Sequence, residues 1–205
     1  MKPIETLMRR APVIPVLVIE EVAHAAPVAA ALVAGGLTVL EVTLRTPVAL
    51  AVIREMARVP GAVVGAGTVL NERDVGASRE AGAQFIVSPG LTPQVAQAAA
   101  RMQIPLLPGI ANAGDLMRGL ELGLNHFKFF PAESLGGIGM LKALAAPFGH
   151  CLFCPTGGIR AETAASWLAL PAVLCVGGSW LVPAGMPDAA AIETRARAAA
   201  ALTRP

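Results

Sequence analysis

The sequence predicts an α/β fold, a single-domain (β/α)₈ TIM barrel, and three observations carry this prediction. Short β-rich segments recur roughly every twenty to twenty-five residues, with alanine-rich stretches of helical spacing between them. Apolar residues make up 55% of the chain and charged residues 15%, which is typical of a parallel sheet buried under helices. No linker or low-complexity segment divides residues 1–205, so one domain is expected. A doubly wound open sheet has the same alternation and is the alternative fold.

The β-rich segments are the eight expected strands, at residues 13–18, 38–42, 63–66, 84–87, 104–107, 126–129, 151–153 and 173–176. Helices are expected between them, for example at residues 23–34, 47–58, 93–102 and 115–122. Polar residues predict helix starts at Thr46-Pro47, at Asn71 with Asp74, and at Thr92-Pro93. Glycines predict helix ends at Gly35-Gly36, Gly82 and Gly123. The chain therefore reads as repeated strand–helix units.

Charge and composition argue against several functional classes. The net charge is +2 without a basic run, so nucleic acid is not an expected partner. Residues 163–187 carry no charge, but Pro171, Gly177-Gly178 and Pro183 would break a spanning helix, so no membrane partner is expected. The N-terminus shows no cleavable signal, and the three cysteines are odd in number, so a cytoplasmic protein with reduced thiols is expected.

Metal and redox chemistry are also not expected. Cys151 and Cys154 match the C-x-x-C spacing, but an offset of three residues on a strand places them on opposite faces. A zinc or redox role needs the two thiols together with further ligands. The three histidines show no metal-ligand spacing. We therefore assign no metal site.

A lysine inside an apolar, aromatic strand is the main candidate for chemistry. The chain has only three lysines, and of these Lys128 alone lies in a predicted buried strand. A desolvated lysine, unlike arginine, can lose its proton and act as a nucleophile. Strand alternation turns Phe127 and Phe129 outward, and His126 and Lys128 inward.

The second predicted strand carries the matching carboxylate. In Leu40-Glu41-Val42-Thr43-Leu44-Arg45, the apolar residues alternate with Glu41, Thr43 and Arg45, which would face the barrel interior. Buried charges need a partner or a function. A purely structural ion pair of Glu41 with Lys128 or Arg45 is the simpler alternative.

Loops after the strands supply polar and glycine-rich segments at the end of a barrel where active sites lie. Gly65-Ala-Gly-Thr68 resembles the start of a dinucleotide motif, but Leu70 breaks the pattern. Ser88-Pro89-Gly90 and Pro108-Gly109, taken alone, are ordinary turns. Gly157-Gly158 and Gly177-Gly178-Ser179 follow the seventh and eighth strands, where this fold frequently binds phosphate. These paired glycines therefore predict a phosphate site.

Five phrases occur in order between about residues 13 and 183. They are Leu-Glu-Val-Thr-Leu-Arg-Thr (40–46), Val-Gly-Ala-Gly-Thr-Val-Leu (64–70), Phe-Lys-Phe-Phe-Pro-Ala-Glu (127–133), Cys-Pro-Thr-Gly-Gly-Ile (154–159) and Val-Gly-Gly-Ser-Trp-Leu-Val-Pro (176–183). Together they closely resemble the 2-keto-3-deoxy-6-phosphogluconate (KDPG) aldolase family, which also covers 4-hydroxy-2-oxoglutarate (KHG) aldolase activity. Departures from the family lie at 134–139 and 111–114, outside the motif residues, where loop mobility or substrate preference can differ.

The resemblance implies a class I aldolase that needs no metal or organic cofactor. Lys128 would form a Schiff base with the C2 ketone of the substrate, and Glu41 would be the general acid and base. The substrate would be a phosphorylated keto acid, cleaved to pyruvate and glyceraldehyde 3-phosphate, with activity on KHG as well. The resemblance also implies a homotrimer and a place in the Entner–Doudoroff pathway.

It further assigns the residues that bind the substrate. Arg45 and Thr68 would hold the substrate carboxylate, and Thr156 a hydroxyl group. Pro89 and Phe130 would shape the pocket around the pyruvyl end. The phosphate would be bound by Gly157, Gly158, Gly178 and Ser179.

Two other functions are compatible with parts of this pattern. Another phosphate-binding TIM-barrel enzyme, an isomerase or a decarboxylase, would keep the glycine loops without a Schiff base on Lys128. A non-catalytic sugar-phosphate binder would use Lys128 only as an ion-pair partner.

Overall fold

The strands of the protein form a closed parallel barrel in the computed structural model, which describes residues 2–203. Within these residues the strands are β1 (Val13–Leu17), β2 (Val39–Thr43), β3 (Val63–Gly67), β4 (Phe85–Val87), β5 (Leu106–Leu107), β6 (Gly109–Ile110), β7 (His126–Phe129), β8 (Leu152–Pro155) and β9 (Val176–Gly178). One sheet has the order β5-β4-β3-β2-β1-β9 and a second the order β6-β7-β8, with every pair parallel.

Two junctions join these sheets into a ring. The fifth predicted strand, 104–107, contains only β5, and β6 begins at Gly109, where a turn was predicted. Pro108 separates the two strands because proline has no N–H to donate to a ladder. Single bridges from Phe153 to Val173 and from Thr156 to Gly177 connect β8 to the β9 edge. The sheet therefore closes on itself, and the open-sheet alternative is wrong.

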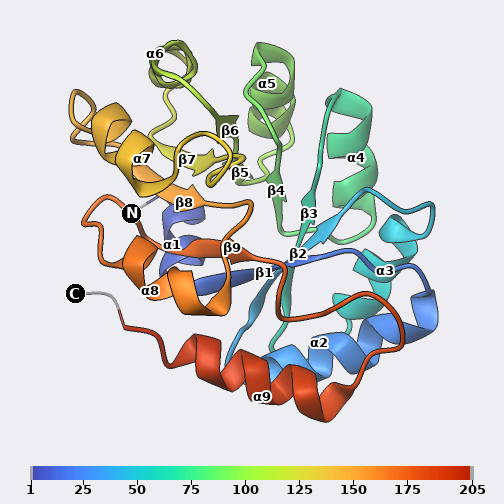
Figure 1. Ribbon diagram of the computed structural model, residues 1–205. Coiled ribbons are helices and arrows are strands. Elements are labelled where there is room, and N and C mark those ends of the chain that lie inside the picture. The colour runs from blue at the N-terminus through green and yellow to red at the C-terminus, as the bar shows by residue number, and fades with distance from the viewer. Residues whose placement is uncertain (1, 204–205) are drawn as a thin grey trace.

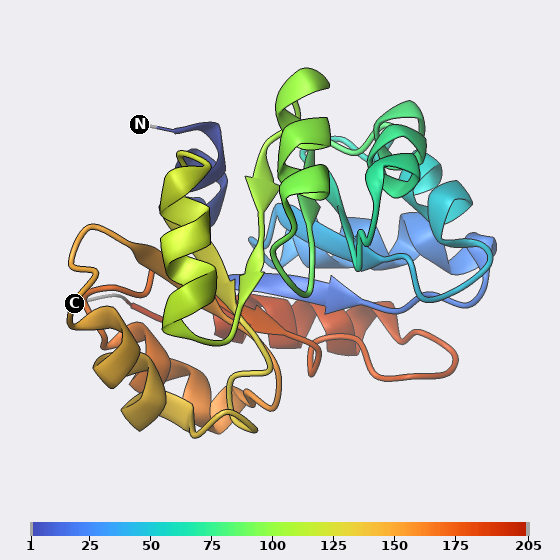
Figure 2. The same ribbon diagram turned by 90° about the horizontal axis from the view of Figure 1, so that it is seen from above.

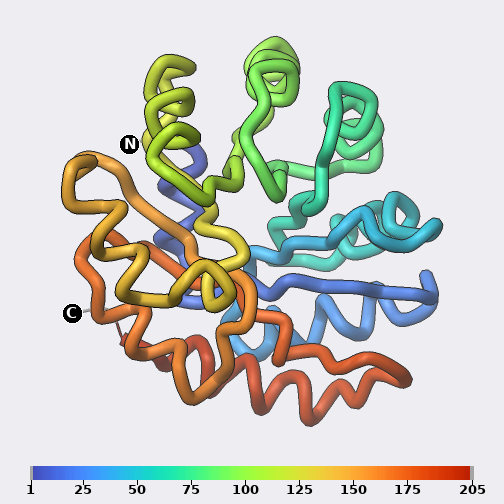
Figure 3. The backbone as a smooth tube through the Cα atoms, turned by 45° about the horizontal axis from the view of Figure 1, so that its top comes forward, coloured from blue at the N-terminus to red at the C-terminus, as the bar shows by residue number. Residues whose placement is uncertain are grey.

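Helices surround the barrel, one after nearly every strand. They are α2 (Ala25–Ala34), which follows a short 3₁₀ turn at Val22–His24, α3 (Ala49–Met56), α4 (Glu72–Glu80), α5 (Pro93–Arg101), α6 (Ala113–Glu121), α7 (Gly137–Ala145), α8 (Ala161–Leu168) and α9 (Ala189–Ala200). Figures 1 and 3 show the strand–helix units following one another around a common centre. The last helix, α9, packs against α2, which completes the helix layer (Figures 1 and 2). None of the helices within residues 2–203 is both long and apolar enough to cross a membrane.

Two separate apolar clusters confirm the predicted alternation of the strands. Leu40, Val42, Phe127 and Phe129 belong to the large cluster between the strands and the helices. A smaller cluster fills the barrel interior with residues such as Ile14, Val39, Phe85, Leu107 and Cys154. Because successive side chains on a strand point to opposite faces, the residues between the outward-facing ones must line the interior. This places Glu41 and Lys128 inside the barrel.

Most of the predicted helix boundaries are confirmed, and one predicted cap is wrong. The side chains of Asn71 and Thr92 accept hydrogen bonds from the N–H groups of Asp74 and Val95, at 3.0 and 3.3 Å. The predicted terminal glycines Gly36, Gly82 and Gly123 have φ angles of 92°, 95° and 75°. Thr46 caps no helix: its hydroxyl donates to the carbonyl of Ile19 at 2.9 Å, and α3 begins after Val48.

The eighth strand is also displaced from its prediction. It spans Val176–Gly178, whereas residues 173–176 were expected, and Val173 makes only a single bridge. Residues 173–175 follow a turn and meet β8 only at the Val173–Phe153 bridge, and regular pairing with β1 begins at Val176, opposite Val13. Gly177 and Gly178 are therefore the last two residues of the strand and not part of a loop as predicted; the loop begins at Ser179.

The N-terminal helix α1 (Pro3–Arg9) covers the amino ends of the strands. Ile4 and Met8 are buried in the interior cluster. Beside them, Nε2 of His126 lies 3.4 Å from Oε2 of Glu5, whose other oxygen accepts a hydrogen bond from Arg9 at 2.8 Å. Burial lowers the pKa of His126, against the opposing attraction of Glu5. His126 faces inward as predicted, but it lies at the amino ends of the strands, beside α1.

This site makes the stability of the fold depend on pH. The lowered pKa means that the unfolded chain takes up a proton on this histidine before the folded chain does, so acidification favours unfolding. We expect the free energy of unfolding to fall between pH 7 and pH 5, and to fall less steeply in His126→Gln. Urea unfolding at several pH values measures both slopes. The exposed His150→Gln is the control and should follow the wild type; a slope unchanged by His126→Gln would contradict this account.

Candidate active site

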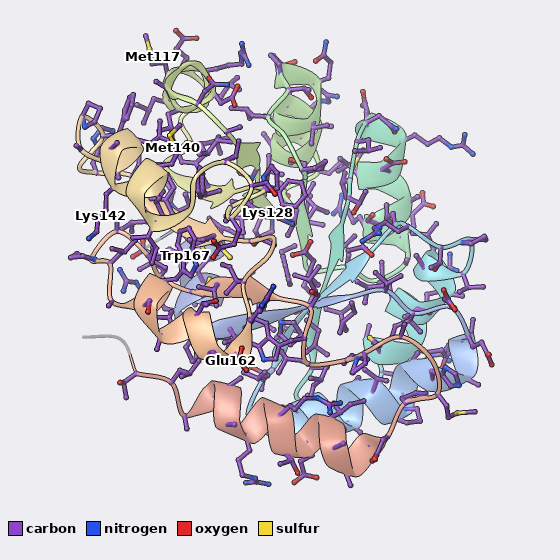
Figure 4. The ribbon with its side chains drawn as sticks, in the orientation of Figure 1. Met117, Lys128, Met140, Lys142, Glu162 and Trp167 are labelled. Carbon is purple, nitrogen blue, oxygen red and sulfur yellow. The ribbon has the colours of Figure 1, made fainter. Side chains whose placement is uncertain are left out.

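An ion pair between β2 and β7 lies at the centre of the barrel. Nζ of Lys128 is 3.1 Å from Oε1 of Glu41, and the two side chains are only 7% and 4% exposed. These strands are not neighbours in the sheet, so the two side chains meet across the interior. Figure 4 shows Lys128 inside the ring of strands, whereas Lys142 projects outward from α7. The predicted alternative partner, Arg45, makes no ion pair among the described residues. Its predicted position inside the barrel is wrong, because β2 ends at Thr43 and Arg45 is exposed in the turn that follows.

Glycines on the strands next to β2 and β7 make room for the carboxylate of Glu41 and for the backbone of Pro89. On β3, Gly67 is the register partner of Thr43 of β2. A Cβ atom added to Gly67 would overlap the carboxylate of Glu41. Gly109 is the register partner of Lys128, and a Cβ there would overlap the carbonyl of Pro89. Both positions therefore require glycine because another group occupies the space. The contact also places Pro89 beside the strand next to Lys128.

An aromatic ring covers one side of the lysine. Nζ of Lys128 lies 5.2 Å from the centre of the Phe130 ring, a distance at which an ammonium group and a π face attract each other. Cys154 is the register partner of Lys128 on β8, and its side chain is buried in the interior cluster. Lys128 is thus surrounded by an apolar ring, a thiol and one carboxylate. The Phe130 ring is therefore positioned to form one wall of a pocket around the amine.

Thr68 follows β3 with a backbone conformation that is unusual for its residue type. Its φ angle is 59°, in the left-handed region, which β-branched side chains rarely adopt. Such strain persists where the surrounding structure holds it and is concentrated at functional sites. The N–H of Leu44 donates to the carbonyl of Gly67 at 2.9 Å, so Thr68 and the exposed Arg45 extend from the same point of the rim. The two predicted carboxylate-binding residues are therefore brought close together.

The predicted phosphate loop follows β8, the strand next to the one that carries Lys128. Thr156 is buried directly after β8, and its bridge to Gly177 brings Gly157-Gly158 beside Gly178 and Ser179. Gly157 and Gly158 have φ angles of 103° and 80°, which only glycine adopts without strain. The loop leads into the N-terminus of α8, where the helix dipole favours an anion.

A hollow of about 360 Å³ opens at this rim, between the end of β1 and the segment after β9. Val16 and Ser179 line it, and Val16 is the register partner of Glu41. The hollow does not itself include Lys128, because the amine lies deeper among the strands. Ser179 is the one predicted site residue that lines it, and the carboxylates of Glu20 and Glu21 line it as well. Sequence reasoning did not identify Val16, whose apolar type gives no signal.

The two cysteines of the C-x-x-C motif belong to different apolar clusters. Cys151 belongs to the outer cluster and Cys154 to the interior one, so their predicted opposite orientation is confirmed. Among residues 2–203, no three His, Cys, Asp or Glu side chains are grouped as metal ligands would be. The charged chemistry available at the site is therefore an amine and a carboxylate in contact, flanked by an arginine and by glycine loops.

Comparison with known proteins relates the chain to one enzyme family. The model of the KDPG and KHG aldolase family matches residues 4–195. A 2-dehydro-3-deoxy-phosphogluconate aldolase of Zymomonas mobilis is 57% identical over 204 residues, covering 100% of this chain and 98% of the relative. The KHG/KDPG aldolase of Escherichia coli is 53% identical over 186 residues, covering 90% and 87% of the two chains.

Solved structures agree with these sequence matches. The Zymomonas mobilis aldolase, solved with 3-phosphoglycerate, superposes with a TM-score of 0.98 at 57% identity, covering 100% of this chain and 98% of the other. The KDPG aldolase of Legionella pneumophila superposes with a TM-score of 0.94 at 44% identity, covering 98% and 99% of the two chains. That structure holds pyruvate captured at low pH as a covalent carbinolamine intermediate.

Replacing Gly67 tests whether the space around Glu41 is needed. Gly67→Ala should push the carboxylate away from Lys128 and cost roughly 1–3 kcal/mol of stability through overpacking. A displacement of the order of 1 Å should lower turnover about a hundredfold. Urea unfolding and steady-state kinetics measure the two effects.

The matched control is Gly139→Ala on α7, where an added Cβ meets open space. It should leave activity unchanged and stabilise the helix by roughly 0.5–1 kcal/mol. Full activity in Gly67→Ala would show that the position of Glu41 is not critical.

Proposed function

The chain belongs to the KDPG and KHG aldolase family, and we propose that Lys128 and Glu41 perform its chemistry as Schiff-base nucleophile and general acid/base. The enzyme is a carbon–carbon lyase that cleaves 2-dehydro-3-deoxy-6-phosphogluconate to pyruvate and glyceraldehyde 3-phosphate, and it acts also on 4-hydroxy-2-oxoglutarate. The observation that supports the assignment of residues is the buried contact of 3.1 Å between the only amine and the only carboxylate of the described barrel interior.

Formation of the Schiff base begins with proton transfer. Glu41 is in contact with Nζ and can accept the proton that Lys128 must lose before it attacks the C2 carbonyl carbon. The new C–N bond gives a carbinolamine. Protonation of its hydroxyl by Glu41 then releases water and leaves an iminium ion. The carbinolamine in the Legionella pneumophila enzyme is the same kind of intermediate.

Cleavage uses the iminium as an electron sink. Glu41 removes the proton of the C4 hydroxyl, the C3–C4 bond breaks, and its electron pair moves into an enamine while the aldehyde leaves. Proton return to C3 and hydrolysis of the imine release pyruvate and restore the amine of Lys128. Because the reaction passes protons back and forth at one place, a single carboxylate beside the amine can serve every step.

The rim residues fit the two ends of this substrate. Arg45 can bind the carboxylate through two parallel hydrogen bonds, with the hydroxyl of Thr68 beside it. Thr156 is placed for a substrate hydroxyl, and Phe130 and Pro89 enclose the pyruvyl end. The phosphate would lie against Gly157, Gly158, Gly178 and Ser179. The phosphate-containing 3-phosphoglycerate found with the Zymomonas mobilis enzyme supports an anion site of this kind in the family.

The proposal also covers the domain organisation, the oligomeric state, the compartment and the pathway of the enzyme. We propose that residues 1–205 act as one domain, that the enzyme is a cytoplasmic homotrimer, and that its reaction serves the Entner–Doudoroff pathway. The family resemblance supports the trimer and the pathway, and the free cysteines fit a reducing compartment. Light scattering of the purified enzyme tests the trimer, since a monomer or dimer mass would contradict it.

Lys128→Arg discriminates the aldolase from the isomerase, decarboxylase and binder alternatives. Arginine keeps the positive charge beside Glu41 but cannot form an imine, so KDPG cleavage should fall by roughly a thousandfold or more. Substrate affinity, measured by calorimetry, should change little. Lys142→Arg, on the exposed face of α7, is the control and should be fully active. Cleavage that survives Lys128→Arg would exclude a Schiff base at this residue.

A further inference from the structure

A hydrogen bond outside the barrel interior connects the loop after β7 to α8. Glu133 lies four residues beyond the end of β7, and its Oε1 accepts a hydrogen bond from Nε1 of Trp167 at 3.0 Å. Trp167 is 1% exposed and belongs to the outer cluster. Figure 4 shows it between α7 and α8, on the same side of the barrel as Lys128. The carboxylate of Glu133 is therefore directed into the helix layer, away from the amine.

The backbone of the same segment holds the glycine loop after β8. The N–H of Glu133 donates to the carbonyl of Gly157 at 3.1 Å, and the N–H of Ala132 donates to that of Thr156 at 2.8 Å. The side chain adds a packing contact: a Cβ placed on Gly158 would lie 2.7 Å from both Cβ and Cγ of Glu133. The segment Thr156–Gly158 is therefore supported by two backbone hydrogen bonds, from Ala132 and Glu133, and by the Cβ and Cγ atoms of Glu133.

Trp167 links this contact to the strand that carries the lysine. Its ring centre lies 6.3 Å from that of Phe129, with an angle of 49° between the planes, and Phe129 is the neighbour of Lys128 on β7. Loss of the carboxylate would remove this partner of the indole N–H at a partly buried position, which is unfavourable. The loop, the indole and the lysine strand therefore form one packed unit.

We propose that Glu133 is a positioning residue that, through its hydrogen bond to Trp167, holds the Gly157-Gly158 loop at a fixed distance from Lys128. This inference rests on the proposed function, in which Lys128 binds the carbonyl end of the substrate and the loop its phosphate. Only a substrate with both groups depends on that distance. The hydrogen bond therefore contributes to selection of the phosphorylated substrate over the unphosphorylated one.

Three variants separate the parts of this contact. Glu133→Ala removes the acceptor, the charge and most of the stem. Glu133→Gln keeps an acceptor oxygen for the indole and removes only the charge. Trp167→Phe removes the N–H donor together with part of the buried ring volume, and it keeps an aromatic ring beside Phe129. Glu80→Ala is the control, since it removes an exposed carboxylate at the end of α4 that makes no hydrogen bond within residues 2–203.

The readouts are kcat and KM with KDPG and with KHG, the rate of pyruvate trapping by borohydride, and the affinity for inorganic phosphate by calorimetry. In Glu133→Ala and Trp167→Phe we expect KM for KDPG and the phosphate dissociation constant to rise about tenfold. KHG kinetics, pyruvate trapping and kcat should stay within about twofold of the wild type. Glu133→Gln should resemble the wild type, because the amide oxygen still accepts from Trp167.

The results that overturn the proposal are distinct from these. Wild-type behaviour of both Glu133→Ala and Trp167→Phe would show that the hydrogen bond positions nothing. Equal losses with KDPG and KHG, together with slower trapping, would show a general effect on the fold or on Lys128. If Glu133→Ala does not fold, Trp167→Phe provides the same test. Failure of the proposed function is recognised separately, because the wild type would then trap no pyruvate, while its phosphate affinity would still report on the loop.

Discussion

The buried contact between Lys128 and Glu41 is the interaction on which the other features of the site depend. Removing both charges from water is costly, and removing one partner of such a pair typically costs 3–5 kcal/mol. The barrel tolerates the pair because its immediate surroundings are arranged for it. Gly67 leaves the space for the carboxylate of Glu41, and the Phe130 ring lies against the ammonium. In the proposed function the pair is retained for its reactivity, because a carboxylate in contact with an amine can move protons to and from a bound carbonyl compound.

The two ends of the barrel have different physical tasks. At the amino ends of the strands, α1 closes the interior with Ile4 and Met8, and the His126–Glu5 contact joins helix to strand. At the carboxyl ends, the chain accepts strain at Thr68 and left-handed glycines at Gly157-Gly158. Stability is thus concentrated at one end, and at the other the backbone is shaped for ligands. The segment around Glu133 belongs to the second end, although its side chain is anchored in the helix layer.

Features that follow from local periodicity could be predicted from the sequence. A period of two in 40–43 and 126–129 is sufficient to place Glu41 and Lys128 inside the barrel, and the paired glycines at 157–158 indicate a loop with left-handed backbone after β8. That this loop binds phosphate stays a prediction. Features that depend on distant partners could not be predicted. Thr46 has the residue type of a helix cap, but a carbonyl 27 positions away takes its hydroxyl. The Glu133–Trp167 hydrogen bond spans 34 positions, and the left-handed φ of Thr68 contradicts the preference of its residue type. The predicted start of the eighth strand was wrong because the pairing with β1 decides where the strand begins, and the apolar residues of 173–176 do not.

Borohydride reduction in the presence of pyruvate, followed by peptide mass mapping, tests the central claim most directly. The chain has three lysines, at positions 2, 128 and 142, so the position of a stable adduct can be assigned without ambiguity. The account predicts one adduct per chain, on the peptide that contains Lys128, and a marked loss of that adduct in Glu41→Gln because the carboxylate no longer accepts the proton. An adduct on another lysine, or none on an enzyme that still cleaves KDPG, would contradict the assignment of Lys128 as the Schiff-base residue.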